Sequence, residues 1–354
     1  MAKYHVAGVM SGTSLDGLDL AYCLLHQDNK KWNHRIMKTR TVPYDGSMVK
    51  FLTETSEYSG KELERRNITF GSFIGKTTAA FLEDNNLKAD LIASHGHTIF
   101  HQPEKGFTYQ LGSGAAIASR SGITTISDFR SLDVANGGQG APLVPAGDEY
   151  LFSEYHFCLN LGGFSNVSFR ENGRRIAFDI CPVNIFINQI CRRMGQEFDD
   201  KGRIASSGHV NSHMLEHWNA LAYYRQNEPK SLSREWLETE FLPVMKHDGL
   251  RTEDILRTAY EHFSIQISDV LNRFPDGKVL VTGGGAYNEF LLDLIREKTK
   301  NHLEIPDSTL IKYKEALVFA LLGVLKYRNE INCFSSVTGA RCDSSTGVIH
   351  RISK

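Results

Sequence analysis

The sequence of 354 residues lacks several features that would place it in a specialised class of protein. No apolar run approaches the length of a membrane span, and no long apolar stretch near the first residues predicts a signal peptide. The six cysteines form no CxxC pair and no zinc-ligand spacing, which favours reduced thiols over a disulfide framework. The formal net charge of −1 disfavours a general binder of nucleic acid or acidic membranes. We therefore expect a soluble cytoplasmic protein with small-molecule partners.

The composition is that of a globular protein, with 41% hydrophobic and 23% charged residues. The chain is long enough for two domains, and the same pattern of elements occurs twice along it. Each half begins with three hairpin-connected strands and continues into helices, which predicts a duplicated α/β architecture. The boundary is expected at residues 135–136, which gives domains 1–135 and 136–354, and it is left open whether the C-terminal segment rejoins the first domain. The expected strands are 4–10, 17–25 and 32–42, then 156–161, 166–169 and 175–179, and the helical patterns include 61–86, 184–194, 209–226 and 251–274.

A glycine-rich turn lies between the first two expected strands. Gly12 and Gly17 permit backbone conformations that turn several N–H groups to one side, while Thr13 and Ser14 add hydroxyl donors. Asp16 adds a carboxylate. Converging amides suit a phosphate and a nearby carboxylate suits its Mg²⁺, although an ordinary hairpin turn would also explain the composition.

Two further glycine turns occur in the second half. One follows the strand at 156–161, and the other follows a strand at 278–282 and precedes a helix. Glycines let a ligand approach the backbone closely, so both turns are candidates for nucleotide contact, with ordinary strand connections as the alternative. The residues concerned are Gly162 and Gly163 in the first turn, and Gly283, Gly284, Gly285 and Asn288 in the second.

Asp179 is the candidate catalytic carboxylate, because it ends an expected strand whose apolar residues would fix its position. A carboxylate held in this way could take a proton from an attacking nucleophile, although a helix N-cap role is the alternative. Arg130 offers a planar fork for a carboxylate or phosphate, or else a structural ion pair with Asp128 or Asp133.

Three other motifs have competing interpretations. His95, His97 and His101 suggest a metal site, but they need not converge, and a sugar contact by His97 is the better interpretation. The run 71–77 misses the Walker A spacing by one residue inside a helical pattern, so we dismiss it as a phosphate loop. Glu315 is expected to open a helix, where a carboxylate is favourable.

Taken in order, the motifs resemble those of the anhydro-N-acetylmuramic acid kinases, a branch of the actin/sugar-kinase superfamily, from about residue 6 to 347. The resemblance implies two ribonuclease-H-like domains flanking an ATP cleft. It also implies a kinase that uses ATP, Mg²⁺ and water to convert 1,6-anhydro-N-acetylmuramic acid to N-acetylmuramic acid 6-phosphate in cell-wall recycling. The family tends to form homodimers, although the sequence has no interface signature.

The resemblance also assigns roles to residues. Asp179 matches the base, and Arg130 and Glu315 match residues beside the sugar. His97 stands where the family has a glutamine and is assigned to the sugar side with Asn166. The three glycine turns bind ATP, and Asp16 holds Mg²⁺ directly or through water. The sequence departs from the family motif Asp-Thr-Gly-Pro at Ile180, which replaces the threonine and its hydroxyl, and at Cys181. Cys181 and the following Val183 stand at positions that are usually small in the family, and we expect their bulk to crowd the sugar or γ-phosphate. A degenerate member that senses ATP or the sugar without phosphorylating it is therefore the alternative.

Overall fold

The computed structural model describes residues 2–245 and 249–352. The chain divides into two compact units, one comprising Met1–Leu151 and Tyr313–Lys354 and the other Phe152–Lys312. The division thus falls after Leu151, whereas the sequence suggested residue 135, and the C-terminal segment belongs to the first unit. The helix α5 (Val144–Leu151) follows the glycine loop at 137–141, and Lys314 of the C-terminal segment forms a buried ion pair with its Asp148. None of the described helices is long and apolar enough to cross a membrane.

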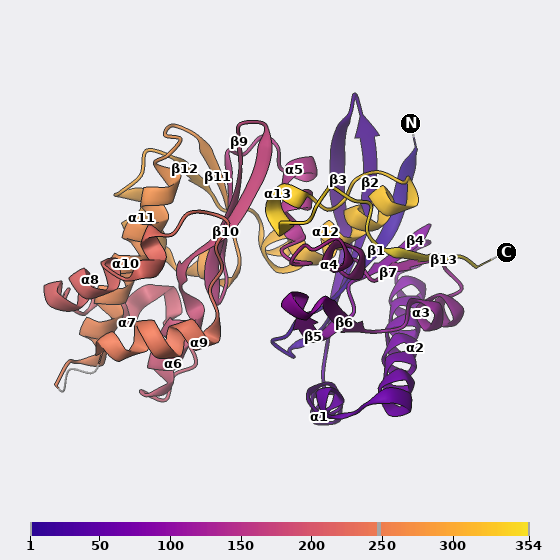
Figure 1. Cartoon of the computed structure of the whole chain (residues 1–354), viewed down its shortest axis with the longest axis horizontal. Helices are drawn as coiled ribbons and strands as arrows, with labels where there is room; N and C mark the ends of the chain where they lie inside the picture. Colours follow the sequence, from indigo (N-terminus) through magenta and orange to yellow (C-terminus); the bar gives the residue numbers. More distant parts are fainter. Residues whose placement is uncertain (1, 246–248, 353–354) are drawn as a thin grey trace. The chain divides into compact units, whose positions relative to one another are not determined.

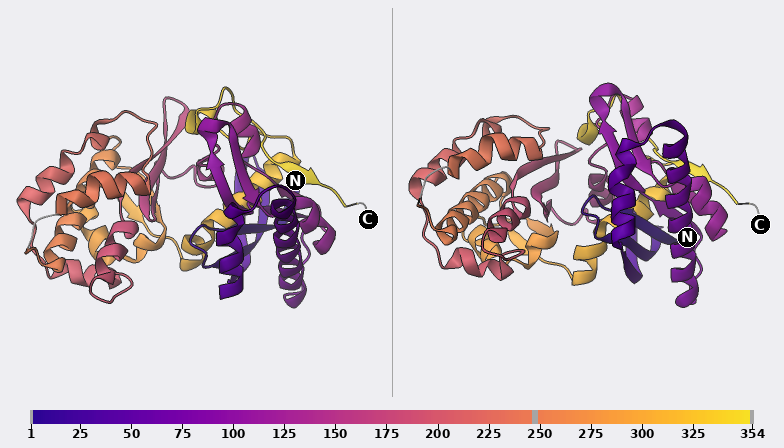
Figure 2. Two further views of the ribbon diagram at one scale, coloured as in Figure 1. Left: turned by 60° about the horizontal axis from the view of Figure 1, so that its bottom comes forward. Right: turned by 90° about the horizontal axis from the view of Figure 1, so that it is seen from below.

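The first unit is built on a six-stranded sheet in the order β13-β7-β4-β1-β2-β3. Strands β1, β2 and β3 are antiparallel neighbours, β4 is parallel to β1, β7 is parallel to β4, and β13 is antiparallel to β7. In all views the C-terminal segment lies against this unit (Figures 1 and 2). The expected first three strands are confirmed. The bounds are β1 Lys3–Ser11, β2 Gly17–Asp28, β3 Lys31–Pro43, β4 Leu91–Ser94, β7 Thr125–Ser127 and β13 Val348–His350.

The segment that nearly matches a phosphate loop lies inside α2 (Gly60–Asp84), as the helical pattern predicted. Helix α3 (Gly114–Ser121) packs directly on it (Figure 1). A Cβ at Gly71 would lie 2.6 Å from the carbonyl oxygen of Ser113, and one at Gly75 would lie 2.8 Å from that of Ile117. These glycines therefore serve close helix packing, and a phosphate role is excluded by their position.

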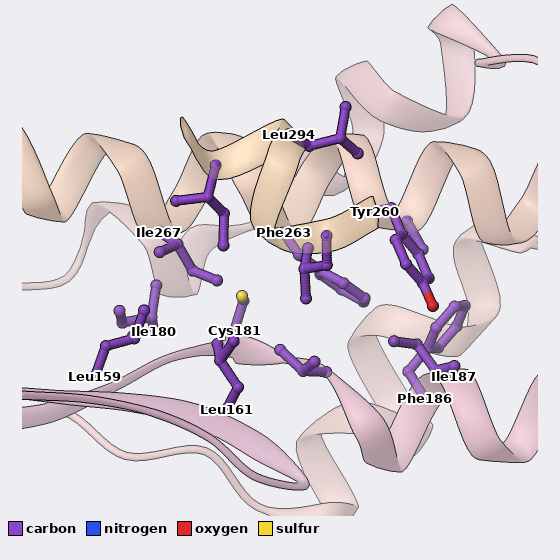
Figure 3. Packing of buried hydrophobic residues seen from close by; sticks show 14 of the residues in the cluster. Leu159, Leu161, Ile180, Cys181, Phe186, Ile187, Tyr260, Phe263, Ile267 and Leu294 are labelled. Carbon is purple, nitrogen blue, oxygen red and sulfur yellow. The ribbon is translucent and has the colours of Figure 1, made fainter. Parts of the chain in front are cut away.

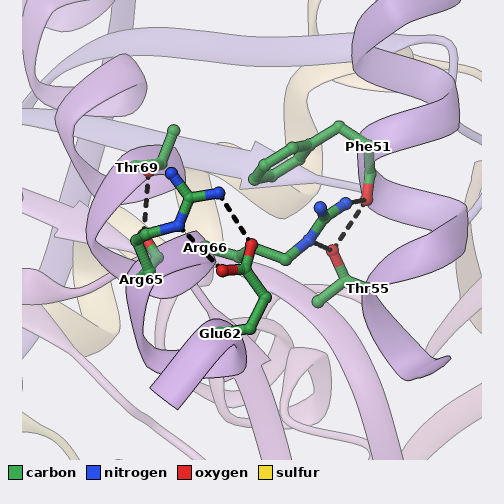
Figure 4. A network of polar contacts seen from close by, with 6 residues as sticks. All are labelled: Phe51, Thr55, Glu62, Arg65, Arg66 and Thr69. Atoms are coloured by element: carbon green, nitrogen blue, oxygen red, sulfur yellow. Dashed lines mark hydrogen bonds and ion pairs between the residues drawn. The ribbon is translucent and has the colours of Figure 1, made fainter. Parts of the chain in front are cut away.

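A buried arginine joins α1 (Gly46–Glu54) to α2. Arg66 donates from Nε to the Thr55 hydroxyl at 2.9 Å and from Nη2 to the Phe51 carbonyl, while its guanidinium lies 4.0 Å from the centre of the Phe51 ring (Figure 4). The preceding residue, Arg65, forms two hydrogen bonds to Glu62, one turn earlier at the surface. The buried contacts of Arg66, more than the exposed pair, hold α1 against α2 because exposed ion pairs contribute little.

The second unit repeats the topology of the first with different residues. Its five-stranded sheet has the order β10-β9-β8-β11-β12, in which β8, β9 and β10 are antiparallel and β11 and β12 run parallel to β8. This is the same arrangement as β3-β2-β1-β4-β7, so the predicted duplication of a ribonuclease-H-like α/β domain is confirmed at the level of topology. The bounds are β8 Phe157–Leu161, β9 Phe164–Glu171, β10 Arg174–Pro182, β11 Lys278–Thr282 and β12 His302–Glu304.

Helices cover one face of this second sheet and form its apolar core. Leu159 and Leu161 from β8 meet Phe263 and Ile267 from the long helix α10 (Figure 3). The helical pattern at 209–226 is shorter than expected, because α8 ends at Asn219 and only a 3₁₀ turn follows at Ala222–Arg225. The helices are α6 Asn184–Arg192, α7 Arg203–Ser206, α8 Ser212–Asn219, α9 Arg234–Trp236, α10 Thr252–Leu271 and α11 Glu289–Arg296.

The remaining elements complete the first unit and its connection to the second. Strands β5 and β6 form a separate antiparallel hairpin, and α12 contains the division between the units, since Tyr313 lies within it. The bounds are β5 His97–Gln102, β6 Phe107–Leu111, α4 Ser131–Ala135, α12 Ser308–Tyr327 and α13 Ser335–Thr338.

Candidate functional site

The turn between β1 and β2 has the predicted strand–turn–strand form. Among the described residues, a Cβ added to Gly12 would meet only Ser14, with its Oγ at 3.5 Å, so the space over this glycine is open. A Cβ added to Gly17 would lie 2.5 Å from the Val42 carbonyl oxygen, so Gly17 is needed for packing on β3. Of the two glycines in this turn, only Gly12 leaves room for a ligand.

The polar residues of this turn face solvent. Thr13, Ser14 and Asp16 are exposed, while Asp19, at the start of β2, accepts a hydrogen bond from the Thr41 hydroxyl at 2.5 Å. Within the described residues no three His, Cys, Asp or Glu side chains gather to hold a metal ion. A lone exposed carboxylate fits Mg²⁺, which usually keeps several waters and binds one or two carboxylates together with substrate phosphates.

Arg130 is held in place by two acceptors. Its Nε donates to Nε2 of His95 at 2.9 Å, and its Nη1 donates to the Gly140 carbonyl oxygen at 2.6 Å. Because Nε2 of His95 must accept, the proton lies on Nδ1, which faces the Gly96 carbonyl oxygen at 3.0 Å. Burial and the Arg130 charge hold the pKa of His95 well below its usual range. Arg130 is therefore positioned by a neutral histidine and is not ion-paired with Asp128 or Asp133.

A buried carboxylate, that of Asp133, organises the glycine loop at 137–141. The sequence suggested for Asp133 only an ion pair with Arg130. Asp133 accepts from the Gly140 N–H at 2.8 Å and from the Thr338 hydroxyl at 2.8 Å. A Cβ on Gly138 would lie 2.2 Å from its Oδ2. Through Thr338, the C-terminal segment thus helps to shape the loop whose Gly140 carbonyl oxygen accepts from Arg130. Residues so far apart in the sequence leave no local pattern from which this contact could be predicted.

The three candidate metal-binding histidines go to separate partners. His97 Nδ1 lies 2.9 Å from the Ser11 hydroxyl, which also accepts from Tyr44 at 2.7 Å, whereas His101 Nδ1 lies 3.1 Å from Thr108 Oγ1. With His95 committed to Arg130, they share no common centre. His97 is buried, and this burial lowers its pKa, so it stays a neutral hydrogen-bonding group.

Glu315 does not open a helix, contrary to expectation. Helix α12 begins at Ser308, where the Asp307 carboxylate accepts from the Leu310 N–H at 2.8 Å, so Glu315 lies two turns inside it. Its side chain remains exposed to solvent, yet surrounding protein raises its pKa, an effect that Arg130 and Lys314 oppose. The carboxylate is therefore placed in the electrostatic neighbourhood of Arg130, within the same unit.

Asp179 lies within β10, which continues across a bulge to Pro182, and not at the strand end that the sequence suggested. Its Oδ2 accepts from the Leu232 N–H at 2.9 Å, and its own N–H donates to the Lys230 carbonyl oxygen at 3.2 Å. Burial raises the pKa of its carboxyl, which makes the ionised form a stronger base, while the Leu232 bond opposes this. Asp179 does not cap α6, whose N-cap residue is Val183.

The three departures from the family motif lie in the apolar core. The bulge between Asp179 and Cys181 allows Ile180 and Cys181 to join the same buried cluster, together with Val183. Figure 3 shows Cys181 among Leu161, Phe263 and Ile267. The expectation that their bulk crowds the ligand was wrong, because the strand bulge directs these side chains into the core.

The glycine turns of the second unit differ in the space around them. A Cβ on Gly163 would approach nothing closer than Ile185 at 3.7 Å, and one on Gly284 nothing closer than Asn184 at 3.6 Å. Gly162, Gly283 and Gly285 are tightly packed, and Gly283 has φ +82°. The backbone at Gly163 and Gly284 is therefore uncovered, with space that a side chain would occupy in any other residue. Such space lets a ligand approach the backbone closely, so the two turns fit a nucleotide.

Asn288 caps the next helix. Its Oδ1 accepts from the Leu291 N–H at 3.1 Å, and its Nδ2 donates to the Tyr260 hydroxyl at 2.7 Å. A 3₁₀ turn, Gly284–Tyr287, separates the glycines from α11, where the sequence suggested that the helix follows directly. The oxygen and the nitrogen of the Asn288 side-chain amide thus both form hydrogen bonds within the protein, which gives Asn288 a structural role.

The doubled ribonuclease-H-like topology, with a glycine turn after the first strand of each unit and a carboxylate on the third strand of the second, is that of the actin/sugar-kinase fold. Among solved structures, component A of the (R)-2-hydroxyglutaryl-CoA dehydratase of Acidaminococcus fermentans aligns over 92% of this chain and 99% of its own (TM-score 0.48, 14% identity). A ROK-family glucokinase from Streptomyces griseus aligns over 90% and 99% (TM-score 0.38, 12% identity).

Sequence comparison is more specific. The anhydro-N-acetylmuramic acid kinase family profile matches residues 4–351. Relatives with that name include proteins from Bacillus cereus strain AH187, 31% identical over 95% of this chain and 96% of theirs, and from Vibrio cholerae serotype O1, 33% identical over 97% of each. The chain belongs to the anhydro-N-acetylmuramic acid kinase family.

Proposed function

We propose that this protein phosphorylates 1,6-anhydro-N-acetylmuramic acid at O6 with ATP while water opens the anhydro bridge at C1. The products are N-acetylmuramic acid 6-phosphate and ADP, in the recycling of cell-wall sugars in the cytoplasm. The observation that carries the proposal is Asp179, a half-buried carboxylate with a raised pKa, oriented by Leu232 on the same sheet that carries two open glycine turns.

In the proposed reaction Asp179 takes a proton from water, and that water forms a bond to C1 as the bond from C1 to O6 breaks. O6 leaves with the electron pair and forms the new bond to the γ-phosphorus of ATP, from which ADP departs. Each event helps the other, because the leaving oxygen of one step is the nucleophile of the next. Mg²⁺, when bound near Asp16, supplies charge stabilisation for the transferring phosphoryl group.

The sugar contacts are assigned to Arg130, Glu315 and His97 in the first unit and to Asn166 in the second. Arg130 offers its remaining guanidinium N–H groups to a carboxylate, and the lactyl carboxylate of the substrate has the matching geometry. The open glycines Gly12, Gly163 and Gly284 are the backbone positions assigned to ATP. The homodimer stays a prediction.

Nothing favours the alternative of a sensor without activity. The residues that motivated it, Ile180, Cys181 and Val183, belong to the core and leave the carboxylate of Asp179 accessible to a ligand. Their burial in the core therefore supports the kinase over the sensor.

The test is to mix the protein with Mg-ATP and 1,6-anhydro-N-acetylmuramic acid and to follow ADP and the sugar by mass spectrometry. ADP and a sugar heavier by one water and one phosphoryl group should form in equal amounts. N-acetylmuramic acid, which has no anhydro bridge, is the control acceptor and should give much less ADP. Sugar-independent ADP formation, or no product at all, would contradict the proposal.

A further inference from the structure

Asp179 lies on β10, the edge strand of the second sheet. An edge strand has a row of N–H and C=O groups without a neighbouring strand, and these groups need other partners. At Asp179, the backbone N–H donates to the Lys230 carbonyl oxygen at 3.2 Å, and the backbone carbonyl oxygen accepts from the Tyr223 hydroxyl at 2.5 Å. The carboxylate Oδ2 accepts from the Leu232 N–H at 2.9 Å. Residues 223–232, which we call the edge segment, therefore bind the N–H, the carbonyl and the carboxylate of one residue.

The edge segment is closed on itself by a lysine. The Lys230 ammonium donates to the carbonyl oxygens of Tyr223 at 3.3 Å and of Gln226 at 3.2 Å, and it lies 4.8 Å from the centre of the Tyr223 ring. The Tyr223 ring also lies 5.3 Å from the ring of Trp236, and the residue is buried. These contacts fix the ring, so the position of its hydroxyl against Asp179 is fixed as well.

The neighbouring tyrosine has a different target. The Tyr224 hydroxyl lies 2.8 Å from Nε2 of His262 on α10, and Nδ1 of His262 lies 2.7 Å from Oδ1 of Asn219, the last residue of α8. His262 is fully buried, so this second set of contacts belongs to the packing between helices. Of the two adjacent hydroxyls, only that of Tyr223 is bonded to Asp179.

The backbone that Tyr223 binds is irregular. The register of β10 against β9 shifts between Asp179 and Cys181, and such a bulge disrupts the ladder locally and redirects side chains. The carbonyl bound by Tyr223 belongs to the peptide that joins Asp179 to Ile180, within this irregular stretch. The direction of the Asp179 side chain therefore depends on contacts from outside the sheet.

We propose that Tyr223 is a positioning residue for the catalytic base, because its hydroxyl fixes the bulged peptide after Asp179 and thereby keeps the carboxylate on the Leu232 N–H. This inference rests on the proposed function, since it takes Asp179 as the base. Tyr223 acts as a neutral hydrogen-bond donor, and burial raises the pKa of its hydroxyl and so keeps the proton in place.

The test is Tyr223→Phe, which keeps the ring against Trp236 and removes only the hydroxyl. The turnover number for ADP formation with 1,6-anhydro-N-acetylmuramic acid should fall about tenfold, the factor expected from one lost hydrogen bond. The KM for Mg-ATP and the Kd for the non-hydrolysable analogue AMPPNP should keep their wild-type values, because no contact to the nucleotide is removed. A substitution that merely loosened the fold would change affinity and turnover together.

Tyr224→Phe is the matched control. It removes the adjacent hydroxyl, which is bonded to His262, and leaves the three contacts of Asp179 in place. Its melting temperature should fall at least as far as that of Tyr223→Phe, because a buried His262 ring nitrogen loses its partner. Its turnover should nevertheless stay at the wild-type value.

Amide hydrogen exchange, followed by mass spectrometry without substrate, tests the same contact independently of turnover. In Tyr223→Phe, the fragments that contain Asp179 and Leu232 should exchange faster than in the wild type, because the edge segment separates from β10 more often. The same fragments should exchange more slowly in Tyr224→Phe than in Tyr223→Phe.

A double-mutant cycle with Asp179→Asn decides whether Tyr223 acts through the base. In the asparagine background, where the base is already absent, Tyr223→Phe should cause no further loss of turnover. Wild-type turnover in Tyr223→Phe, an equal loss in Tyr224→Phe, or the full further loss in the asparagine background would each overturn the inference. A wild type that converts no sugar would overturn the proposed function, whereas the exchange rates would still confirm or overturn the hold of Tyr223 on Asp179.

Discussion

Replacing Asp179 with asparagine tests the catalytic centre with the least structural change. The Leu232 N–H that now binds Oδ2 at 2.9 Å can bind the asparagine carbonyl oxygen instead, so the side chain should keep its orientation. The amide cannot accept the proton of the attacking water. The expected result is a folded protein that binds AMPPNP as the wild type does but has lost most of its turnover.

The size of the loss follows from the role. Removing a general base costs about 10²–10⁴ in rate, which corresponds to about 3–5 kcal/mol of transition-state stabilisation. Asp179 should be at the upper end of that range, because burial raises its pKa and thereby increases its basicity. The assay is ADP formation with 1,6-anhydro-N-acetylmuramic acid at saturating Mg-ATP.

The pH profile adds an independent check on the same residue. The base is the ionised form, so activity should fall as pH decreases through the pKa of Asp179, and this limb should lie above the ordinary carboxyl value of 3.8. Leu232→Pro removes the N–H that lowers this pKa, so its limb should move to higher pH. Full activity of Asp179→Asn, or an acid limb that is unchanged in Leu232→Pro, would refute the assignment.

Three further predictions follow from packing and burial. Gly12→Ala should leave the free energy of unfolding unchanged and weaken binding of the ATP analogue AMPPNP, because the space over Gly12 is open. Gly17→Ala should destabilise the protein by about 1–3 kcal/mol, because its Cβ would lie 2.5 Å from the Val42 carbonyl oxygen. Equal melting temperatures of the two variants would contradict this difference. Restoring glycine at Cys181 or Val183 should cost about 1–3 kcal/mol of stability with no gain in turnover, and an increase in turnover would show that these side chains obstruct the site. Burial lowers the pKa of His262 from 6.5 to about 3, so the unfolded state takes up its proton first as pH falls. The contribution of His262 to stability is then complete above about pH 6.5 and should fall by up to about 1.4 kcal/mol per pH unit below it. Urea unfolding can measure this slope, and a variant without the imidazole of His262 that keeps the full slope would contradict the assignment.

Local features of the sequence were predicted well because they depend on neighbouring residues. Apolar runs separated by turn residues located β1, β2 and β3, and the segment that nearly matches a phosphate loop was correctly assigned to a helix from its surroundings. The error at Glu315 has a local cause as well, since Asp307 is a capping residue that marks the true start of α12.

Relations between distant segments could not be predicted in this way. The contact of Leu232 with Asp179 spans 53 residues, and that of Thr338 with Asp133 spans 205. The core position of Cys181 depends on a strand bulge that leaves no compositional trace.

The central claim is that water opens the anhydro bridge while ATP phosphorylates the oxygen released. It is tested most directly by running the reaction in ¹⁸O-labelled water and sampling the product before its anomeric oxygen exchanges with solvent. N-acetylmuramic acid 6-phosphate incubated in the same water without the protein measures that exchange. The account predicts that the label is on C1 of the sugar and absent from its phosphate. Label in the phosphate, or phosphorylation with the anhydro bridge intact, would contradict it.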